Sequence, residues 1–514
     1  MVSQDARRFT PDMSLLTHSK AVMTDAKDRL IVLANRAPLK HDYSQGRVVT
    51  TRTASGLVTA LEPLLLEYSG TWVAHAAGQA DAHVMDERRG LDVPPANPQY
   101  RIRYVSLPYS EFIGYYHGFA NEGLWPLCHA ANVQPVFRRR DYEMYRAANT
   151  RFAAVVAEEA GRDSARILVQ DYHYALAPRL LRNQLPDSQV VAFWHIPWPR
   201  PRTFRICPWA IELLDGLLGS DAIGVQTDDD RRNFLGCVEA LLDADVDVNE
   251  GTIEFRGRVT TVRVWPVGVD GGNAVIQSTP SPAECRERLC RELGLPQDVR
   301  LGVGIDRMDY TKGINEKFLA VERLLESHPH LVGRFAFIQI AEPSRDCIDA
   351  YRAARTRVVE TCERVNSRFR TGAFQPIQLV ERHHEPADVY RYYRAADVCF
   401  VGSLHDGMNL VAKEFVAARV DERGVLVLSE FAGAARQLRG ALLVNPLRID
   451  QSAEALACAL TMPAIEQKKR MRVLRDNVRS FDASWWAKEL LDQAANREGR
   501  VSRSITLDRA TAVA

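Results

Sequence analysis

The stretch GIDRMDYTKG, residues 304–313, places two cations five residues apart, Arg307 and Lys312. It follows the apolar run RLGV and precedes INEKFLAVERLLE, so it lies where a predicted strand passes into a predicted helix. The unpaired N–H groups of a helix start, together with two cationic side chains, suit the binding of a diphosphate. The spacing is not that of a P-loop, because G-x-x-x-x-G-K-[ST] is absent. This stretch alone leaves open that both side chains are merely solvated in a loop.

Two further turns place glycine and a polar side chain at the start of a predicted helix. Asp406 and Gly407 lie between the apolar run VCFVG and a helical pattern, and Glu414 lies about two turns further on. Ser55 and Gly56 open another helical pattern. These turns could bind anions. Ordinary helix capping by Asp406 or Ser55, and a solvent-facing carboxylate at Glu414, are the alternatives.

Three groups that look like metal sites are better explained in other ways. TDDDRR (227–232) puts acids at a helix start, where capping and the helix dipole favour them. RHHEP (382–386) lacks the i, i+4 spacing of a zinc helix and indicates a surface loop. His173 in DYHY is alone and is typical of a structural histidine. None of these three groups is therefore expected to bind a metal.

Short apolar runs alternate with helical patterns along most of the chain, which predicts an α/β protein with parallel sheets. A first series of predicted strands covers 29–35, 71–75, 101–107, 166–170, 189–195, 221–227 and 261–268. A second series covers 300–305, 334–340, 376–380, 396–402, 424–429 and 441–445. The Gly-, Ser- and Pro-containing segment 271–287 separates them, so we predict a domain boundary near 270. Each series suits one doubly wound, Rossmann-like domain.

Open parallel sheets bind ligands beyond the carboxyl ends of their strands. Polar side chains follow the predicted strands in both series. If the two domains face each other across a cleft, these side chains meet in one site; they are Asn35, Arg36, Asp171, His173, His195, Arg307, Lys312, Arg345 and Asp406.

The composition sets limits on the function. The chain has 514 residues, 46% hydrophobic and 25% charged, and a formal net charge of +1. This balance is typical of a globular protein of two or three domains, and it supplies no overall field to recruit nucleic acid or a membrane. The 9 cysteines form no C-x-x-C pair, and residues 1–28 lack the apolar core of a signal peptide. We expect a cytoplasmic protein whose segments 1–28 and 498–514 are disordered.

Nine motifs, in order along residues 29–495, resemble those of the trehalose-6-phosphate synthase family. They are LANRAP, YYHGFANEGLWPLCH, QDYHYALAP, FWHIPWP, GVQTDDDRRNF, DRMDYTKG, AEPSRD, DGMNLVAKEF and VLVLSEFAGAARQL. The resemblance implies the GT-B fold of retaining glycosyltransferases, with two facing Rossmann-like domains and a cleft between them. It assigns 29–270 to the acceptor side, 271–465 to the nucleotide sugar, and 466–497 to helices that cross back to the first domain.

The resemblance also implies roles for individual residues. The groups expected to act in catalysis are His195, Asp406, Arg307 and Lys312. The donor would be bound by Gly56, Arg307, Lys312, Asp406, Gly407, Met408, Asn409, Leu410 and Glu414. The acceptor would be bound by Arg36, His75, Tyr116, Trp125, Asp171 and Arg345. The chain departs from the family pattern at Ser55, Gln170 and His405, and at His75, where well-known members have a tryptophan.

The function that the resemblance implies is glucosyl transfer from UDP-glucose to glucose 6-phosphate, giving α,α-trehalose 6-phosphate, in a possible homo-oligomer. The resemblance implies attack on the face from which the diphosphate leaves, with a donor phosphate oxygen taking the acceptor proton, and it implies no metal and no cofactor. Two alternatives stay open. One is a synthase that uses another nucleotide-glucose or another phosphorylated acceptor, as in a glucosylglycerol-phosphate synthase. The other is a non-catalytic regulator that binds sugar nucleotides.

Overall fold

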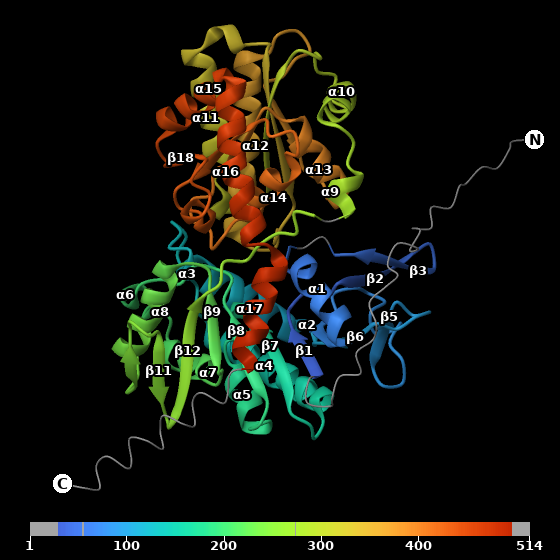
Figure 1. Ribbon diagram of the computed structural model, residues 1–514, viewed down its shortest axis with the longest axis vertical. Coiled ribbons are helices and arrows are strands. Elements are labelled where there is room, and N and C mark those ends of the chain that lie inside the picture. The colour runs from blue at the N-terminus through green and yellow to red at the C-terminus, as the bar shows by residue number, and fades with distance from the viewer. Residues whose placement is uncertain (1–28, 54–55, 273, 496–514) are drawn as a thin grey trace, which may run out of the picture.

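The computed structural model describes residues 29–53, 56–272 and 274–495, and Figure 1 shows two α/β lobes, one above the other. We call residues 29–264 the N-terminal lobe and residues 274–480 the C-terminal lobe. The predicted disordered ends, 1–28 and 498–514, lie outside the described residues, as does Ser55. The domain boundaries near 270 and 465 stay predictions.

The N-terminal lobe is built on a ten-stranded sheet whose seven central strands are parallel. Its central strands, such as RLIVL and TWVAH, are apolar almost throughout, because helices cover both faces. In spatial order the strands are β10 (Asp245–Asp247), β11 (Thr252–Phe255), β12 (Arg258–Val264), β9 (Ala222–Val225), β8 (Gln189–Phe193), β7 (Ala165–Gln170), β1 (Arg29–Leu33), β4 (Thr71–His75), β6 (Tyr100–Val105) and β5 (Gly90–Val93).

The C-terminal lobe is built on a six-stranded parallel sheet. In spatial order its strands are β15 (Ile377–Val380), β14 (Phe335–Glu342), β13 (Arg300–Arg307), β16 (Val398–Val401), β17 (Val425–Ser429) and β18 (Leu442–Val444). Each predicted strand of the second series corresponds to one of these. The order reverses at β13 and β16, the place where a doubly wound sheet binds ligands.

The helices of the N-terminal lobe include one unusual segment. Residues Ile113–Leu124 form a π-helix, η2, a conformation frequently found at functional sites. The other helices are α1 (Gly56–Tyr68), α2 (Tyr109–Phe112), α3 (Trp125–Cys128), α4 (Arg139–Ala160), α5 (Ala177–Gln184), α6 (Pro201–Phe204), α7 (Ala210–Leu217) and α8 (Asp228–Leu241). A two-stranded hairpin, β2 (Leu39–Ser44) and β3 (Arg47–Arg52), stands beside the main sheet.

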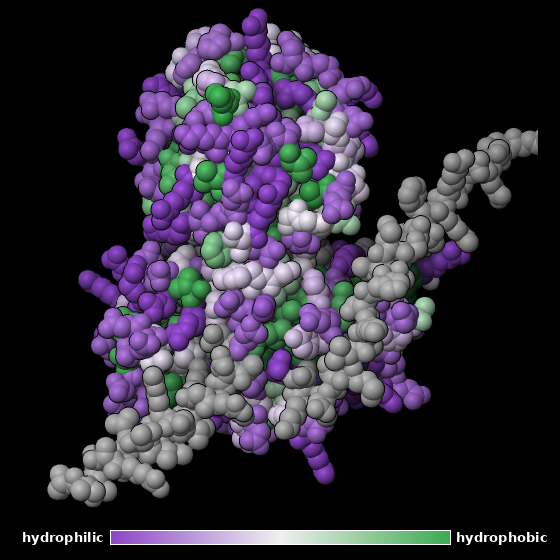
Figure 2. Space-filling view, viewed as in Figure 1, coloured by the Kyte–Doolittle hydropathy of each residue, from purple (hydrophilic) through white to green (hydrophobic). Residues whose placement is uncertain are grey.

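The helices of the C-terminal lobe are α9 (Ala274–Ser278), α10 (Pro282–Glu292), α11 (Ile314–Ser327), α12 (Asp349–Phe369), α13 (Pro386–Ala395), α14 (Leu410–Ala418), α15 (Ile449–Thr461) and α16 (Ala464–Ser480). The face of the molecule across which α16 runs is mainly hydrophilic (Figure 2). Exposed apolar side chains of α16, Ile465 and Val473, are separate from each other in the helix, as is normal for a protein surface. Within the described residues no helix is both long and apolar enough to cross a membrane.

The chain passes between the lobes twice. The first crossing is the segment 265–271, and the second lies between α16 and α17 (Ala483–Ala495), which packs against α1 and β8 of the N-terminal lobe (Figure 1). The crossings touch: a Cβ on Gly268 would lie 2.3 Å from the backbone of Asp482. Trp486 of α17 is buried and meets Phe193 edge-on at 5.0 Å. The C-terminal end of the described chain is therefore part of the core of the N-terminal lobe.

Some elements differ from the sequence predictions. The strand predicted at 261–268 is β12 and ends at Val264, because Pro266 has no N–H to donate to a sheet. The predicted strands 101–107 and 221–227 are shorter, as β6 and β9. The hairpin strands β2 and β3, the edge strands β5 and β10, and β11, which pairs with β10 and β12, were missed. Apart from the buried residues of β11, these strands are largely exposed or half-buried and carry no continuous apolar run.

Candidate active site

The end of β13 and the turn after it carry the first predicted cation pair. Arg307 is the last residue of β13, and the 3₁₀ turn Tyr310–Lys312 follows. The Lys312 Nζ lies 2.5 Å from Oδ2 of Asp406, which follows β16. Burial alone would raise the pKa of Asp406, but Lys312 and the hydrogen bond from Asn409 outweigh it and lower that pKa to about 2. Asp406 is therefore ionised, and it holds Lys312 in place.

Gly407 brings the two lobes into direct backbone contact. A Cβ at this position would lie 2.1 Å from the carbonyl oxygen of His195, which belongs to the N-terminal lobe. Asn409 has φ of 76°, and its side chain caps α14 by accepting the N–H of Ala412 at 3.1 Å. Met408 is buried between them and Leu410 begins the helix. Only glycine permits the lobes to approach this closely here.

Glu414 lies one turn into α14 and is half-buried. Its carboxylate accepts a hydrogen bond from the Tyr393 hydroxyl at 3.0 Å. Burial raises the pKa of Glu414, and the Tyr393 hydrogen bond opposes that rise. The structure thus places this carboxylate on the same helix whose start faces the cleft.

Arg345 reaches from the C-terminal lobe to aromatic side chains of the N-terminal lobe. It follows β14, its backbone has a φ of 53°, and its side chain is 6% exposed. Its Nη2 donates to the Tyr172 hydroxyl at 3.3 Å. The guanidinium carbon lies 4.5 Å from the centre of the Trp125 ring and 5.8 Å from that of Tyr116. An arginine held by cation–π contacts and a left-handed backbone is fixed before substrate arrives.

Tyr116 belongs to a column of stacked rings in the N-terminal lobe. His75, Phe112, Tyr116 and His173 follow one another with ring centres 4.7, 5.2 and 5.5 Å apart and nearly parallel planes. Burial raises the pKa of Tyr116, but the cation Arg345, with smaller effects of other arginines, outweighs burial and lowers that pKa to about 8. Phe112 ends α2 and Tyr116 lies four residues on, in the π-helix, so the two rings share a face. Because His75 stacks on Phe112, it is one end of this column rather than an isolated residue.

His195 and Asp171 lie side by side at the ends of β8 and β7. The Asp171 Oδ1 accepts the backbone N–H of His195 at 3.1 Å, and the His195 Nε2 lies 2.9 Å from Oε1 of Gln170. Burial raises the pKa of Asp171 to about 6 and lowers that of His195 to about 3. His195 is therefore neutral. A proton on Nε2, donated to Gln170, leaves Nδ1 as an acceptor.

Arg36 is exposed at the edge of the acceptor side. Its carbonyl oxygen accepts the indole N–H of Trp72, and within the described chain its guanidinium makes no hydrogen bond or ion pair. It lines a cavity of about 210 Å³ together with Leu39, Lys40, Thr53, His75 and Asp81 among others. This cation is therefore available to an anionic ligand.

The structure brings most of the predicted residues together, from both lobes. Gly56 stands at the start of α1, and its surroundings are not described. Sequence reasoning missed three groups that contact the predicted ones, namely Phe112, Tyr172 and Asp309. Asp309 lies two residues after Arg307, and an acidic side chain so close to a predicted binding cation could have been recognised as its partner. Phe112 ends α2 and lies four residues before Tyr116, so the i, i+4 spacing of a helix was a signal for it as well.

Two rejected metal motifs have the structures that were predicted for them. Thr227 caps α8 by accepting the N–H of Asp230 at 3.1 Å, and His383 in the loop before α13 is exposed and lies 2.8 Å from Glu342. Over the described ranges, no cluster of three or more His, Cys, Asp or Glu is arranged to hold a metal.

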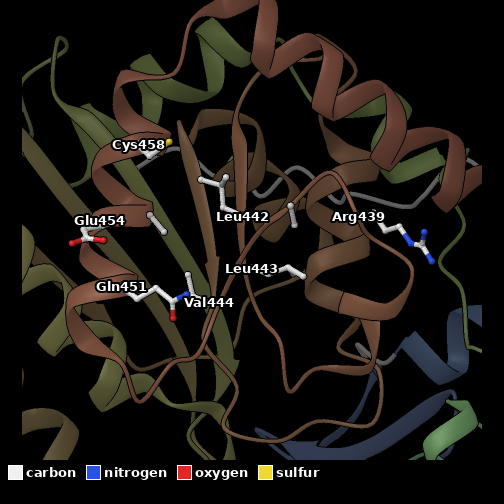
Figure 3. Close-up of a pocket in the computed structure, with 9 residues that line it drawn as sticks. Arg439, Leu442, Leu443, Val444, Gln451, Glu454 and Cys458 are labelled. Atoms are coloured by element: carbon white, nitrogen blue, oxygen red, sulfur yellow. The ribbon is translucent and has the colours of Figure 1, made fainter.

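A cavity of about 450 Å³ lies away from this site. It is lined by Arg439, Leu442, Leu443, Val444, Gln451, Glu454 and Cys458 among others, beside the edge strand β18 and the helix α15 (Figure 3). None of the predicted site residues lines it. The convergence of charged groups, and not cavity size, identifies the candidate site.

Comparisons with known proteins agree with this geometry. A model of glycosyltransferase family 20 matches residues 28–496. A trehalose-6-phosphate synthase of Mycobacterium avium is 36% identical over 476 residues, covering 90% of this chain and 95% of the relative. One of Mycolicibacterium gilvum is 36% identical over 488 residues, covering 92% and 95%.

Two solved structures have the same fold over nearly their whole length. The first is an alpha,alpha-trehalose-phosphate synthase (UDP-forming) from Burkholderia xenovorans in complex with glucose-6-phosphate, with 32% identity and a TM-score of 0.80. It covers 91% of this chain and 100% of its own. The second, described as trehalose-6-phosphate from E. coli bound with UDP-2-fluoro glucose, has 30% identity and a TM-score of 0.80, covering 91% and 99%.

Proposed function

Because the chain belongs to glycosyltransferase family 20, we propose that it transfers glucose from UDP-glucose to glucose 6-phosphate and so makes α,α-trehalose 6-phosphate. The observation that carries this proposal is the convergence of two arginines on one ring. Arg307 lies 5.3 Å and Arg345 4.5 Å from the centre of the Trp125 ring. Arg307 ends β13, directly before the donor turn, and Arg345 follows the neighbouring strand β14, so a diphosphate and a sugar phosphate would meet between the lobes.

The donor would lie against the C-terminal lobe. Arg307 and Lys312 would hold the diphosphate, and the start of α14 would add its free N–H groups. Glu414 would accept hydrogen bonds from the ribose. Asp406, ionised and fixed by Lys312, would accept one from a glucosyl hydroxyl.

The acceptor would lie against the N-terminal lobe. Arg36 and Arg345 would hold its phosphate from opposite lobes, and the planar guanidinium suits phosphate bidentately. Trp125, Tyr116 and His75 would form the walls, and Asp171 would accept from an acceptor hydroxyl. His195, neutral and with Nδ1 free to accept, would orient the glucosyl ring.

The chemistry follows from where charge develops. The bond between the glucosyl carbon and the diphosphate breaks, so negative charge grows on the leaving diphosphate while the ring becomes positive. Cations fixed at the leaving group stabilise this transition state more than the ground state. The acceptor hydroxyl attacks from the face that the diphosphate leaves, and its proton passes to a diphosphate oxygen. This route requires no carboxylate nucleophile and no metal ion.

We also propose that the protein works in the cytoplasm, where nucleotide sugars are found. All nine cysteines are free, as is typical of a reducing compartment. A homo-oligomer stays a prediction, as does the absence of nucleic acid and membrane partners.

One assay tests the proposal. Purified protein is incubated with UDP-, ADP- or GDP-glucose and with glucose 6-phosphate, glucose or glycerol 3-phosphate, and the product is identified by mass and by NMR of the anomeric proton. We expect UDP-glucose with glucose 6-phosphate to have the highest kcat/KM, an α,α-linked product, and no loss of activity with a chelator. A higher kcat/KM with glycerol 3-phosphate would contradict the acceptor but not the glucosyl transfer.

A further inference from the structure

Asp309 is a buried carboxylate with one oxygen engaged and one oxygen unbonded. Its side chain is completely buried. Its Oδ1 accepts the backbone N–H and the hydroxyl of Thr311, each at 3.0 Å, and so caps the turn that carries Lys312. Its Oδ2 has no hydrogen-bond partner within the described chain. Turn capping therefore explains the position of Oδ1 but gives no role to Oδ2.

The unbonded oxygen lies between the two substrate-facing arginines. It is 3.9 Å from Nη2 of Arg307 and 3.7 Å from Nη1 of Arg345. Both distances are within ion-pair range but beyond hydrogen-bond range. A buried negative charge requires a nearby cation, and here Arg307 and Arg345 are the two within ion-pair range, with a smaller effect of Lys312. The charge of Asp309 is divided between Arg307 and Arg345.

The indole of Trp125 completes the arrangement. Both guanidinium groups lie over its ring, so the two cations are held near each other by a carboxylate and by a π face rather than by tight ion pairs. A tight pair with Asp309 would withdraw either arginine from an incoming phosphate. The longer distances leave neither arginine tied to Asp309 by a hydrogen bond; Arg345 instead donates to the hydroxyls of Tyr351, at 2.5 Å, and Tyr172, at 3.3 Å.

We propose that Asp309 is a positioning residue that couples the donor site to the acceptor site as the shared counter-ion of Arg307 and Arg345. This inference rests on the proposed function, in which Arg307 binds the donor diphosphate and Arg345 the acceptor phosphate. If one arginine is lost, the whole charge of Asp309 falls on the other. That arginine then pairs with Asp309 and competes less well for its own substrate.

The test measures the affinity for UDP alone, so it does not depend on turnover or on the identity of the acceptor. Arg345→Gln removes the acceptor-side arginine and leaves Asp309 to pair with Arg307. We expect the Kd of UDP, measured by calorimetry, to rise about tenfold although no acceptor is present. In Asp309→Asn, which keeps an oxygen to cap the turn, the same Arg345→Gln change should have less than a twofold effect.

Arg36→Gln is the matched control. Arg36 is a second cation predicted to bind the acceptor phosphate, but it has no contact with Asp309, so its loss should leave the Kd of UDP unchanged. A purely structural role of Asp309 would lower the melting temperature without producing this coupling between two substitutions.

Two results would overturn the proposal. An effect of Arg345→Gln that persists in the Asp309→Asn protein would show that Arg345 acts on UDP through space. If Arg36→Gln and Arg345→Gln raise the Kd of UDP equally, Arg345 again acts through space and not through Asp309. This comparison tests the proposal even if the Asp309→Asn protein does not fold. An unsubstituted protein that binds UDP but makes no trehalose 6-phosphate would contradict the proposed function and leave this test intact.

Discussion

At the scale of the residue, Arg307 and Lys312 differ in what holds them before substrate binds. Lys312 is paired with Asp406 at 2.5 Å, whereas Arg307 lies 3.9 Å from Asp309 and makes a cation–π contact with Trp125. Lys312 therefore neutralises a buried charge as well as facing the cleft. Arg307 shares the buried charge of Asp309 with Arg345, so its loss should cost less stability than the loss of Lys312.

We expect Arg307→Ala to lower kcat/KM by a factor that corresponds to a loss of about 2 to 4 kcal/mol of transition-state stabilisation, with little change in thermal stability. Lys312→Ala should lower kcat/KM similarly and also lower the free energy of unfolding, because Asp406 loses its cation. Steady-state kinetics and thermal melts measure both effects. Lys468→Ala, at an exposed position of α16, is the control. Unchanged turnover in both site variants would eliminate the diphosphate assignment.

The pKa of Asp171 gives a pH prediction. Burial raises this pKa to about 6, above the value of about 4 in an unfolded chain, so the folded state binds the proton more tightly. The contribution of Asp171 to stability is then largest below pH 4 and is lost as pH rises through 6. Relative to Asp171→Asn, the parent should gain unfolding free energy as pH falls from 7 to 5.

The same titration should appear in the activity. An ionised Asp171 is needed to accept a hydrogen bond from the acceptor, so kcat/KM for the acceptor should fall below pH 6 in the parent. The Asp171→Asn protein should have a lower kcat/KM, and that value should not fall further below pH 6. Urea titrations at several pH values and a pH–rate profile provide the measurements, and parallel curves for the two proteins would refute the role.

At the scale of the element, the loop after β16 decides how closely the lobes meet. Gly407 has no space for a side chain, since the carbonyl oxygen of His195 occupies that position. This contact links the donor loop of one lobe to the end of β8 in the other. The separation of the two lobes at this contact therefore depends on the absence of a side chain at Gly407.

We expect Gly407→Ala to separate the donor loop from His195 and to lower kcat/KM at least a hundredfold, because misplacing reacting groups by about 1 Å has effects of that size. Gly236→Ala, inside α8 with a nearest contact of 3.4 Å, is the control and should be neutral or slightly stabilising. Kinetics and small-angle scattering report activity and lobe separation. Full activity in Gly407→Ala would mean that the lobes do not need this contact.

The elements also show what sequence could and could not predict. The buried strands of both sheets were predictable, because burial on both faces requires continuous apolar runs such as RLIVL and VLVLS. The π-helix was not, since its sequence IGYYHGFANEGL has no feature that separates it from an α-helix. The positions after the strands were predictable from the carboxyl-end rule. The ring column through Phe112 and the shared contact of Asp309 depend on tertiary packing and were not.

At the scale of the whole molecule, α17 joins the two lobes. Trp486 is buried, meets the Phe193 ring at 5.0 Å and lies 6.0 Å from the His195 ring. The last described helix thus supports the core of the N-terminal lobe and a residue of the candidate site. The two crossings of the chain lie against each other, so the lobes share one hinge.

We expect Trp486→Ala to lower the free energy of unfolding by about 3 to 5 kcal/mol, the usual cost of removing a large buried side chain, and to reduce activity through His195. Trp485→Ala, at the half-buried neighbouring position, should cost less than half as much. Chemical denaturation measures the difference. Equal costs for the two variants would show that α17 does not complete this core.

The return of α17 has a consequence for the order in which the protein forms on the ribosome. All six strands of the C-terminal lobe have been synthesised by residue 444, whereas the N-terminal lobe, although translated first, waits for Trp486 and its neighbours to leave the exit tunnel. Domains generally complete folding once their whole sequence is available. The half of the chain that is made first is therefore finished last, and the site between the lobes is incomplete until the residues of α17 have been synthesised.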